Sequence, residues 1–181
     1  MPLTVRAALT LATAGVALAS LPVPALARDT SARGEPPRED PHIISVGPTY
    51  VYDPAYSGVR TQILVAEQGH RTIVSLKAAG FPAKTAGRTF GAHVHQKACG
   101  KNPADAGEHY RDPKISSKAP LRDKEIWLDL KVRRDGTAKT RTVHRGLVAH
   151  RAAGSIVIHA EPTDPRSGGA GARLLCTNVP F

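Results

Sequence analysis

Hydrophobic and polar residues alternate over short stretches along most of this chain, a pattern typical of β-strands that bury one face. Residues 61–66 and 72–76 are rich in β-branched side chains and are separated by Gly69, so they are predicted to form neighbouring strands. The same texture predicts further strands at 91–95, 125–132, 138–143, 155–160 and 173–176. An Asp-Gly pair at Asp135 and Gly136 is a strong hairpin signal and predicts that 138–143 returns along 125–132.

The segments between these strands contain turn residues and no helical periodicity. The longest, from Gly100 to Arg122, is rich in Pro, Gly, Asp and Lys and is expected to be a long loop. No amphipathic helix or internal repeat is apparent. The fold class predicted from this succession is all-β, a Greek-key β-sandwich or flattened barrel of about eight antiparallel strands.

The first residues have a different character. An apolar run from Ala7 to Leu21 follows Arg6, and prolines lead into Ala25-Leu26-Ala27, the small-residue pattern that signal peptidases recognise. The run is too short for a permanent membrane span. We therefore expect residues 1–27 to be a signal peptide cleaved after Ala27, with an amino-terminal core helix as the alternative. Residues 28–46 are predicted to be a flexible lead-in, residues 47–181 the folded domain, and the protein to be extracellular or cell-wall associated.

The chain contains two cysteines, Cys99 and Cys176. In an exported protein, an isolated pair of this kind is expected to form a disulfide bond. The alternative interpretation is that the two thiols are soft metal ligands.

The net charge is +10, with 25 Lys and Arg against 15 Asp and Glu. Such a protein is attracted to anionic surfaces, including acidic wall polymers, and to small anions. Nucleic acid is not expected as a partner, because the aromatic residues are few and scattered and the basic residues do not gather on a helix. No distinct patch indicates an oligomeric state.

Four of the eight histidines are candidate metal ligands. His93 and His95 lie at i and i+2 of a predicted strand, so their rings share one face and can converge on one ion, although such a pair can equally be polar surface residues. His109 lies in the long loop and His159 ends an apolar strand, with no pattern to show where either ring points. The other histidines are interpreted as solvated: His42, His70, His144 and His150.

The order of these motifs resembles the copper/zinc superoxide dismutase family from about Gly58 to the carboxyl terminus. The matching motifs, in order, are Gly-Ala-His-Val-His at 91–95, Cys99, Gly-x-His-Tyr at 107–110, Ile-Val-Ile-His at 156–159, and Gly-Ala-Gly-Ala-Arg-Leu-x-Cys at 169–176. Each motif is short, and the specificity lies in their joint order.

The resemblance implies a role for each matching residue. His93, His95 and His159 match copper ligands, and His109 matches the histidine that bridges copper and zinc and carries a proton during turnover. Arg173 matches the arginine that holds the superoxide anion, a task suited to a planar and permanently charged guanidinium. Cys99 and Cys176 match the intrachain disulfide bond of the family.

The chain departs from the family at the zinc site. No histidine lies between His109 and Asp129, and one histidine with one aspartate is a poor zinc site. The segment 161–168 is also shorter than the family's charged loop. The resemblance therefore indicates a copper-only variant in which zinc is not expected. A carboxylate is then needed to hold the second nitrogen of His109; among the candidates we favour Asp129, the others being Glu108, Asp112 and Glu125.

These observations predict a secreted superoxide dismutase that converts superoxide to oxygen and hydrogen peroxide at a copper centre without zinc. The alternative is an extracellular copper-binding or copper-buffering protein of the same fold. A basic adhesion module that binds wall polymers would explain the charge but not the order of histidine, arginine and cysteine motifs.

Overall fold

The structure is a computed structural model that describes residues 41–181, with side chains from Ile43 onward. The predicted signal peptide, residues 1–27, and residues 28–40 of the predicted lead-in lie outside the described residues. Within 41–181, the strands are β1 (Pro41–Gly47), β2 (Tyr50–Val51), β3 (Arg60–Gln68), β4 (Arg71–Ala79), β5 (Thr89–Phe90), β6 (Ala92–His95), β7 (Leu130–Lys131), β8 (Ala138–His144), β9 (Ser155–His159) and β10 (Arg173–Asn178). The short helices there are η1 (Pro54–Tyr56), η2 (Ala83–Thr85), η3 (Pro103–Ala106) and α1 (Leu121–Lys124). None of them is long and apolar enough to cross a membrane.

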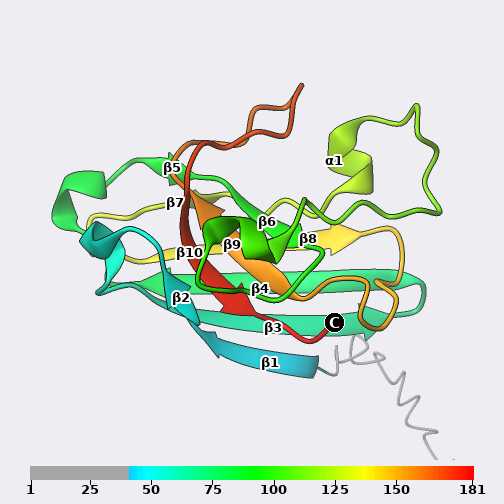
Figure 1. Ribbon diagram of the computed structural model, residues 1–181, viewed down its shortest axis with the longest axis horizontal. Coiled ribbons are helices and arrows are strands. Elements are labelled where there is room, and N and C mark those ends of the chain that lie inside the picture. The colour runs from blue at the N-terminus through cyan, green and yellow to red at the C-terminus, as the bar shows by residue number, and fades with distance from the viewer. Residues whose placement is uncertain (1–40) are drawn as a thin grey trace, which may run out of the picture. The chain divides into compact units, whose positions relative to one another are not determined.

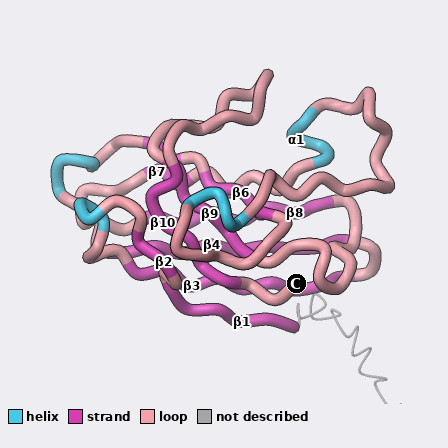
Figure 2. The backbone as a smooth tube through the Cα atoms, in the orientation of Figure 1, coloured by secondary structure: helices cyan, strands magenta, loops and turns pink. Residues whose placement is uncertain are grey.

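Eight of the strands form two four-stranded antiparallel sheets, in the orders β1-β3-β4-β8 and β2-β10-β9-β6 (Figures 1 and 2). The remaining two, β5 and β7, pair with each other. The chain passes from β4 through β5, β6 and β7 before β8 returns to pair with β4, a crossover typical of Greek-key sandwiches. The predicted all-β class is confirmed.

The core lies between the two sheets and follows from the alternation of side chains along the strands. The first sheet contributes buried side chains to this core, among them Ile63 and Val65 of β3 and Leu76 of β4. They belong to the same apolar cluster as Val94 of β6 and Ile156 of β9 from the other sheet. The alternate residues of β6 and β9 therefore face away from this core. Loops cover that second face, and the candidate metal ligands lie there.

The strand predictions at 61–66, 72–76, 91–95, 138–143, 155–160 and 173–176 are confirmed within a few residues. Two other predictions need correction. Residues 41–46, predicted to be part of the flexible lead-in, belong to β1, which pairs with β3 from Gly47↔Thr61 onward. This strand starts at Pro41 directly after a charged, proline-rich stretch, so its β character becomes evident only through the partner that supplies its hydrogen bonds.

The predicted hairpin is also wrong in its pairing. The turn itself forms, with the Arg133 amide donating to the Thr137 carbonyl and the Gly136 amide to the Arg133 carbonyl. However, the two arms join different sheets: β8 pairs with β4, and of residues 125–132 only Leu130–Lys131 form a strand, paired with β5. The apolar residues around β7 are buried in the core, which a simple surface hairpin would not allow.

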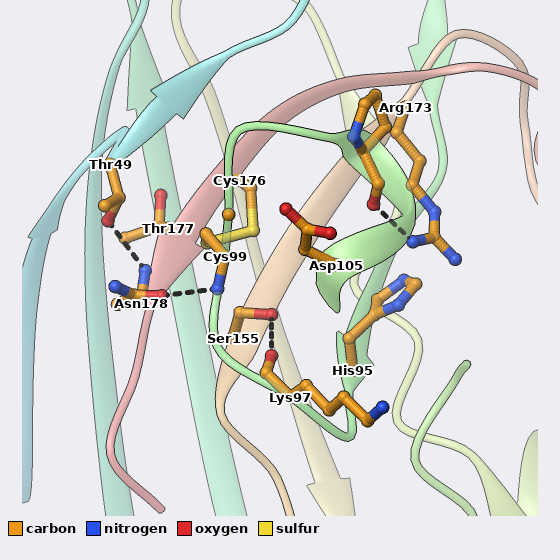
Figure 3. Close-up of a disulfide and its surroundings, with 12 residues drawn as sticks. Thr49, His95, Lys97, Cys99, Asp105, Ser155, Arg173, Cys176, Thr177 and Asn178 are labelled. Atoms are coloured by element: carbon orange, nitrogen blue, oxygen red, sulfur yellow. Dashed lines mark hydrogen bonds between the residues drawn. A yellow bond between two sulfur atoms is a disulfide. The ribbon is translucent and has the colours of Figure 1, made fainter. Parts of the chain in front are cut away.

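A disulfide bond between Cys99 and Cys176 ties the loop after β6 to β10 (Figure 3). The expected bridge is thus confirmed, and the soft-ligand alternative is excluded because no free cysteine exists in residues 41–181. Hydrogen bonds reinforce the junction. The Cys99 amide donates to the Asn178 side chain, and the Asn178 amide donates to the Thr49 hydroxyl.

His144, interpreted from the sequence as solvated, is buried instead. Its side chain is 3% exposed, and its Nε2 lies 3.0 Å from Oδ2 of Asp112, which is 2% exposed. The pair joins the end of β8 to the long loop that carries His109. A buried histidine and carboxylate must satisfy each other in this way, since neither can reach water. His70 and His150 are exposed, as expected.

Replacement of both cysteines by serine is expected to lower the free energy of unfolding by about 2–5 kcal/mol, because the bridge closes a long loop across 77 positions and restricts the unfolded chain. Thermal unfolding of the double variant and of the wild-type protein would measure the difference. A reductant should lower the melting temperature of the wild-type protein and leave that of the variant unchanged. Equal melting temperatures for the oxidised wild type and the variant would contradict the prediction.

Candidate metal centre

The four candidate histidines come together on the loop-covered face of the second sheet. His93 and His95 lie on β6, and His159 ends the adjacent strand β9, where Val157 pairs with His93. Ala92, Val94, Ile156 and Ile158 point into the core. Their strand neighbours therefore point the other way, and this is why the three histidines share a face. His109 reaches the same place from the long loop, which bridges to β6 at His95.

One ligand nitrogen from each of these histidines lies within 4.8 Å of those of the other three. His93 and His95 are fully buried, His159 is 4% exposed, and the side chain of His109 is 17% exposed. In the described part of the chain, this is the one group of three or more histidine, cysteine or acidic side chains able to hold a metal ion. The nitrogen donors suit copper, zinc, nickel or iron.

Backbone carbonyls determine the tautomers of two of the rings. Nδ1 of His95 lies 3.0 Å from the Gly107 carbonyl, and Nδ1 of His159 lies 3.1 Å from the Gly171 carbonyl. A carbonyl oxygen can only accept a hydrogen bond, so both Nδ1 atoms carry the proton. In the neutral rings, the Nε2 atoms then present lone pairs. These two lone pairs face each other across 3.4 Å.

Acidic side chains determine the tautomers of the other two rings. Nδ1 of His109 donates to Glu125 at 3.0 Å. Nε2 of His93 lies 2.8 Å from the Thr163 hydroxyl, whose own proton goes to Asp129. The hydroxyl must therefore accept from His93, which leaves Nδ1 of His93 as a lone pair. That atom is buried and has no hydrogen-bond partner in residues 41–181.

His93, His95 and His159 remain neutral at physiological pH. Burial, followed by repulsion from the neighbouring imidazoles, lowers the pKa of His93 to about 2. Burial is also the main cause for the other two strand residues, lowering the pKa of His95 to about 3 and that of His159 to about 4. Protons therefore do not separate the converging lone pairs. A cation held between them would remove their repulsion, so the donor set fits a metal ion with nitrogen ligands.

Glu125 is the acceptor for His109, and the preference for Asp129 in that role was wrong. Burial disfavours the charged form of Glu125, but hydrogen bonds from His109, Trp127 and Arg111 outweigh it and lower its pKa to about 2. Trp127 Nε1 donates to the same oxygen as His109, at 2.8 Å, and Arg111 Nε donates to the other oxygen at 2.8 Å. Trp127 and Arg111 thus hold the buried carboxylate of Glu125 in place against His109.

Asp129 serves a different ring. It accepts hydrogen bonds from both the amide and the hydroxyl of Thr163, and through that hydroxyl it orients His93. Nothing in the sequence pattern indicated Thr163, Trp127 or Arg111. Glu125 was one of four candidate carboxylates, but an isolated acidic residue sixteen positions after His109 carries no signal of contact.

Arg173 lies directly across β9–β10 from His159, at a register shift in the pairing. Its guanidinium donates to the carbonyls of Pro103 and Gly107, which follow the disulfide-linked Cys99 along the loop. The Gly107 carbonyl also accepts from His95. Gly107 has a φ of +73°, a conformation that favours glycine, and this aims its carbonyl at both partners.

A pocket of about 300 Å³ opens beside the cluster. His109, His159 and Arg173 line it, together with Glu108, Arg111 and the glycine-rich stretch 168–171. The Ser167–Gly171 part of this wall belongs to a tight turn closed by hydrogen bonds between Asp164 and residues 168 and 169. The pocket is small and two arginines border it, so it suits a small anion better than a large organic substrate.

Comparison with known proteins agrees with this geometry. No curated protein matches the chain significantly. The family model for copper/zinc superoxide dismutase (SODC) matches residues 59–179, more than half of the chain and all of the residues that form the cluster. The chain therefore belongs to the copper/zinc superoxide dismutase family.

Proposed function

We propose that this protein is a secreted superoxide dismutase that works with copper alone. The observation that carries the proposal is the convergence of four histidine ring nitrogens within 4.8 Å, with Arg173 lining the pocket beside them. His93, His95, His109 and His159 would hold the ion. When bound, copper supplies the alternating one-electron chemistry that dismutation of superoxide to oxygen and hydrogen peroxide needs.

The protein's own residues position the reactants. Arg173 presents a guanidinium whose orientation is set by two backbone carbonyls, and it would hold the superoxide anion in the pocket. His109 is the most exposed of the four ligands and lines the pocket, so it is the ligand placed to exchange a proton with the substrate at Nε2. Glu125 would keep the proton on Nδ1 of His109 in place throughout.

Two features support a centre without zinc. Nδ1 of His109, the atom that would face a second metal, already donates to Glu125. Asp112, another acidic residue of the same loop, is engaged by His144. Glu125 together with Arg111 and Trp127 would therefore do the orienting that a second metal does elsewhere in the family. The signal-peptide pattern of residues 1–27 supports a different part of the proposal, that the protein is secreted.

Metal analysis and superoxide decay test the proposal on protein purified from culture medium, whose first residue is expected to be Arg28. After exposure to copper and zinc together, we expect about one copper and no zinc per chain. His95→Ala should lose copper and nearly all activity, because three ligands no longer enclose the ion. The control is His70→Ala, which removes an exposed histidine in the turn after β3. Stoichiometric copper without faster superoxide decay would favour copper buffering.

Glu125→Gln is expected to weaken copper affinity by roughly 10- to 100-fold, the usual cost of removing the carboxylate behind a ligand histidine. Competition with a copper chelator measures the affinity. Glu108→Gln is the matched control, because Glu108 is next to His109 and lines the pocket beside the cluster, but makes no side-chain hydrogen bond within residues 41–181. Equal copper affinities for the two variants would show that the bond to His109 is unimportant.

Arg173→Ala is expected to slow superoxide decay at low salt while copper stays bound. Superoxide dismutases are themselves the standard example of electrostatic steering, so we take its general range, a loss of roughly ten- to a thousandfold. Arg173→Lys should recover part of the rate, and the difference should shrink as salt rises. Arg166→Ala, which removes an exposed arginine of the 161–168 segment, is the control. Wild-type rates in the Arg173→Ala variant at low salt would refute the assignment.

A further inference from the structure

A second cationic feature lies on the outer face of the sheet β1-β3-β4-β8, away from the core. In the register of this sheet, Gln62 pairs with Lys77, and Lys77 pairs with Lys139. Their strand neighbours Leu76 and Ala138 are buried in the core, so the two lysines point outward. Two like charges directly opposite each other on neighbouring strands destabilise a sheet. The Lys77–Lys139 pair is therefore unfavourable for the sheet, although a neutral side chain would fit at either exposed position.

The turn before β8 adds further cations to the same region. Lys131, Arg133 and Arg134 lie on or just after β7 and are exposed. The turn is held rigidly, because the Phe81 amide donates to the Gly136 carbonyl and the Gly136 amide donates to the Arg133 carbonyl. These charges therefore have a defined position relative to the sheet.

Two adjoining pockets connect these cations. One, of about 590 Å³, is lined by Lys131, Arg133, Arg134 and Lys139. The other, of about 460 Å³, is lined by Arg60, Lys77, Arg133 and Lys139. The two share Arg133 and Lys139, and no acidic side chain lines either pocket. We call these six residues the basic face.

The basic face has little internal neutralisation. Within the described residues, none of its six side chains forms an ion pair with a carboxylate. The acidic residue nearest in sequence is Asp135. Hydrogen bonds from the hydroxyl and amide of Thr137, and more weakly the charge of Arg133, lower the pKa of Asp135, so Arg133 has an acidic neighbour. None of the six residues lines the pocket beside the histidine cluster. The face is thus separate from the proposed copper centre and needs an explanation of its own.

We propose that the basic face binds an extended polymer of phosphodiesters joined by polyol units. The charges span two joined pockets, more than one phosphate group would occupy. Arg133 and Arg134 supply guanidinium forks that match phosphate oxygens, whereas Nη1 of Arg60 already donates to the carbonyls of Ser57 and Val59. The second pocket also has outward-facing apolar side chains, Val46 and Ala79, which suit short aliphatic linkers between phosphates. No aromatic side chain lines either pocket, so the stacking that single-stranded nucleic acid requires is missing.

The partner is inferred to be a soluble polymer chain and not a lipid surface, because the cations line two shallow pockets joined at Arg133 and Lys139, along which a narrow chain can lie. Such binding would hold the protein on an acidic polymer layer while the histidine cluster stays open to small anions. The net charge of +10 predicts an attraction to acidic wall polymers, and the basic face would be the place where these polymers bind.

The test compares Lys77→Gln/Lys139→Gln with wild type in binding to deacylated poly(glycerol phosphate), measured by titration at low and at physiological salt. Each lost charge-assisted hydrogen bond weakens binding, so a loss of roughly tenfold or more is expected for the double variant. The matched control is Lys114→Gln/Lys118→Gln, which removes the same charge from exposed lysines of the long loop and should bind as wild type does. The polymer should raise the melting temperature of wild type and control more than that of the Lys77/Lys139 variant.

Several outcomes would overturn the proposal. Equal weakening in both double variants would mean that net charge alone attracts the polymer. Equal binding of glycerol phosphate monomer would refute an extended site. Binding to phosphatidylglycerol vesicles or to single-stranded DNA, with none to the polymer, would replace the proposed partner with a lipid surface or a nucleic acid. Superoxide decay by the copper-loaded Lys77/Lys139 variant should equal that of wild type, which separates this proposal from the proposed function.

Discussion

The structure depends on four imidazole lone pairs directed at one another in a buried space. Each ring is deprived of its alternative tautomer, because its second nitrogen donates to an acceptor outside the cluster. Burial keeps the pKa values of His93, His95 and His159 far below physiological pH, so protonation does not relieve the repulsion between the lone pairs. The protein thus maintains an arrangement that is unfavourable on its own and becomes favourable around a cation.

The surrounding structure holds that arrangement in place. The loop after β6 is joined to β10 by the Cys99–Cys176 bond, by the hydrogen bond from the Cys99 amide to Asn178 and by the hydrogen bonds of Arg173. The same loop supplies the Gly107 carbonyl to His95. Farther along the chain, the buried pair of Asp112 and His144 fixes the segment that follows His109. Covalent, ionic and hydrogen-bonded links therefore converge on the loops. The strands position His93, His95 and His159, and a loop must position His109.

Charge is divided between two parts of the molecule. Around the histidine cluster, the cationic Arg111 is paired with the buried Glu125, and Arg173 is oriented by neutral carbonyls. On the outer sheet, Lys77 and Lys139 oppose each other without a carboxylate partner in the described residues. A small anion fits the first environment, and a long polyanion fits the second. The high net charge is therefore distributed over two surfaces with different chemical demands.

The sequence by itself determined the all-β class, most of the strands, the pairing of Cys99 with Cys176, and the candidate ligands His93, His95, His109 and His159. These features follow from local alternation of residues and from motifs whose order is preserved along the chain. The tertiary structure alone decided on which side of β9 the His159 ring lies. Alternation along a strand divides its residues into two faces but does not show which face is covered by the other sheet. The tertiary structure also decided that Glu125 and not Asp129 holds His109, that residues 41–46 form a strand, and that β8 leaves the Arg133–Thr137 turn to pair with β4. Each of these outcomes depends on contacts between residues that are far apart in the chain. Such contacts produce no periodic pattern in the sequence, so the sequence alone does not reveal them.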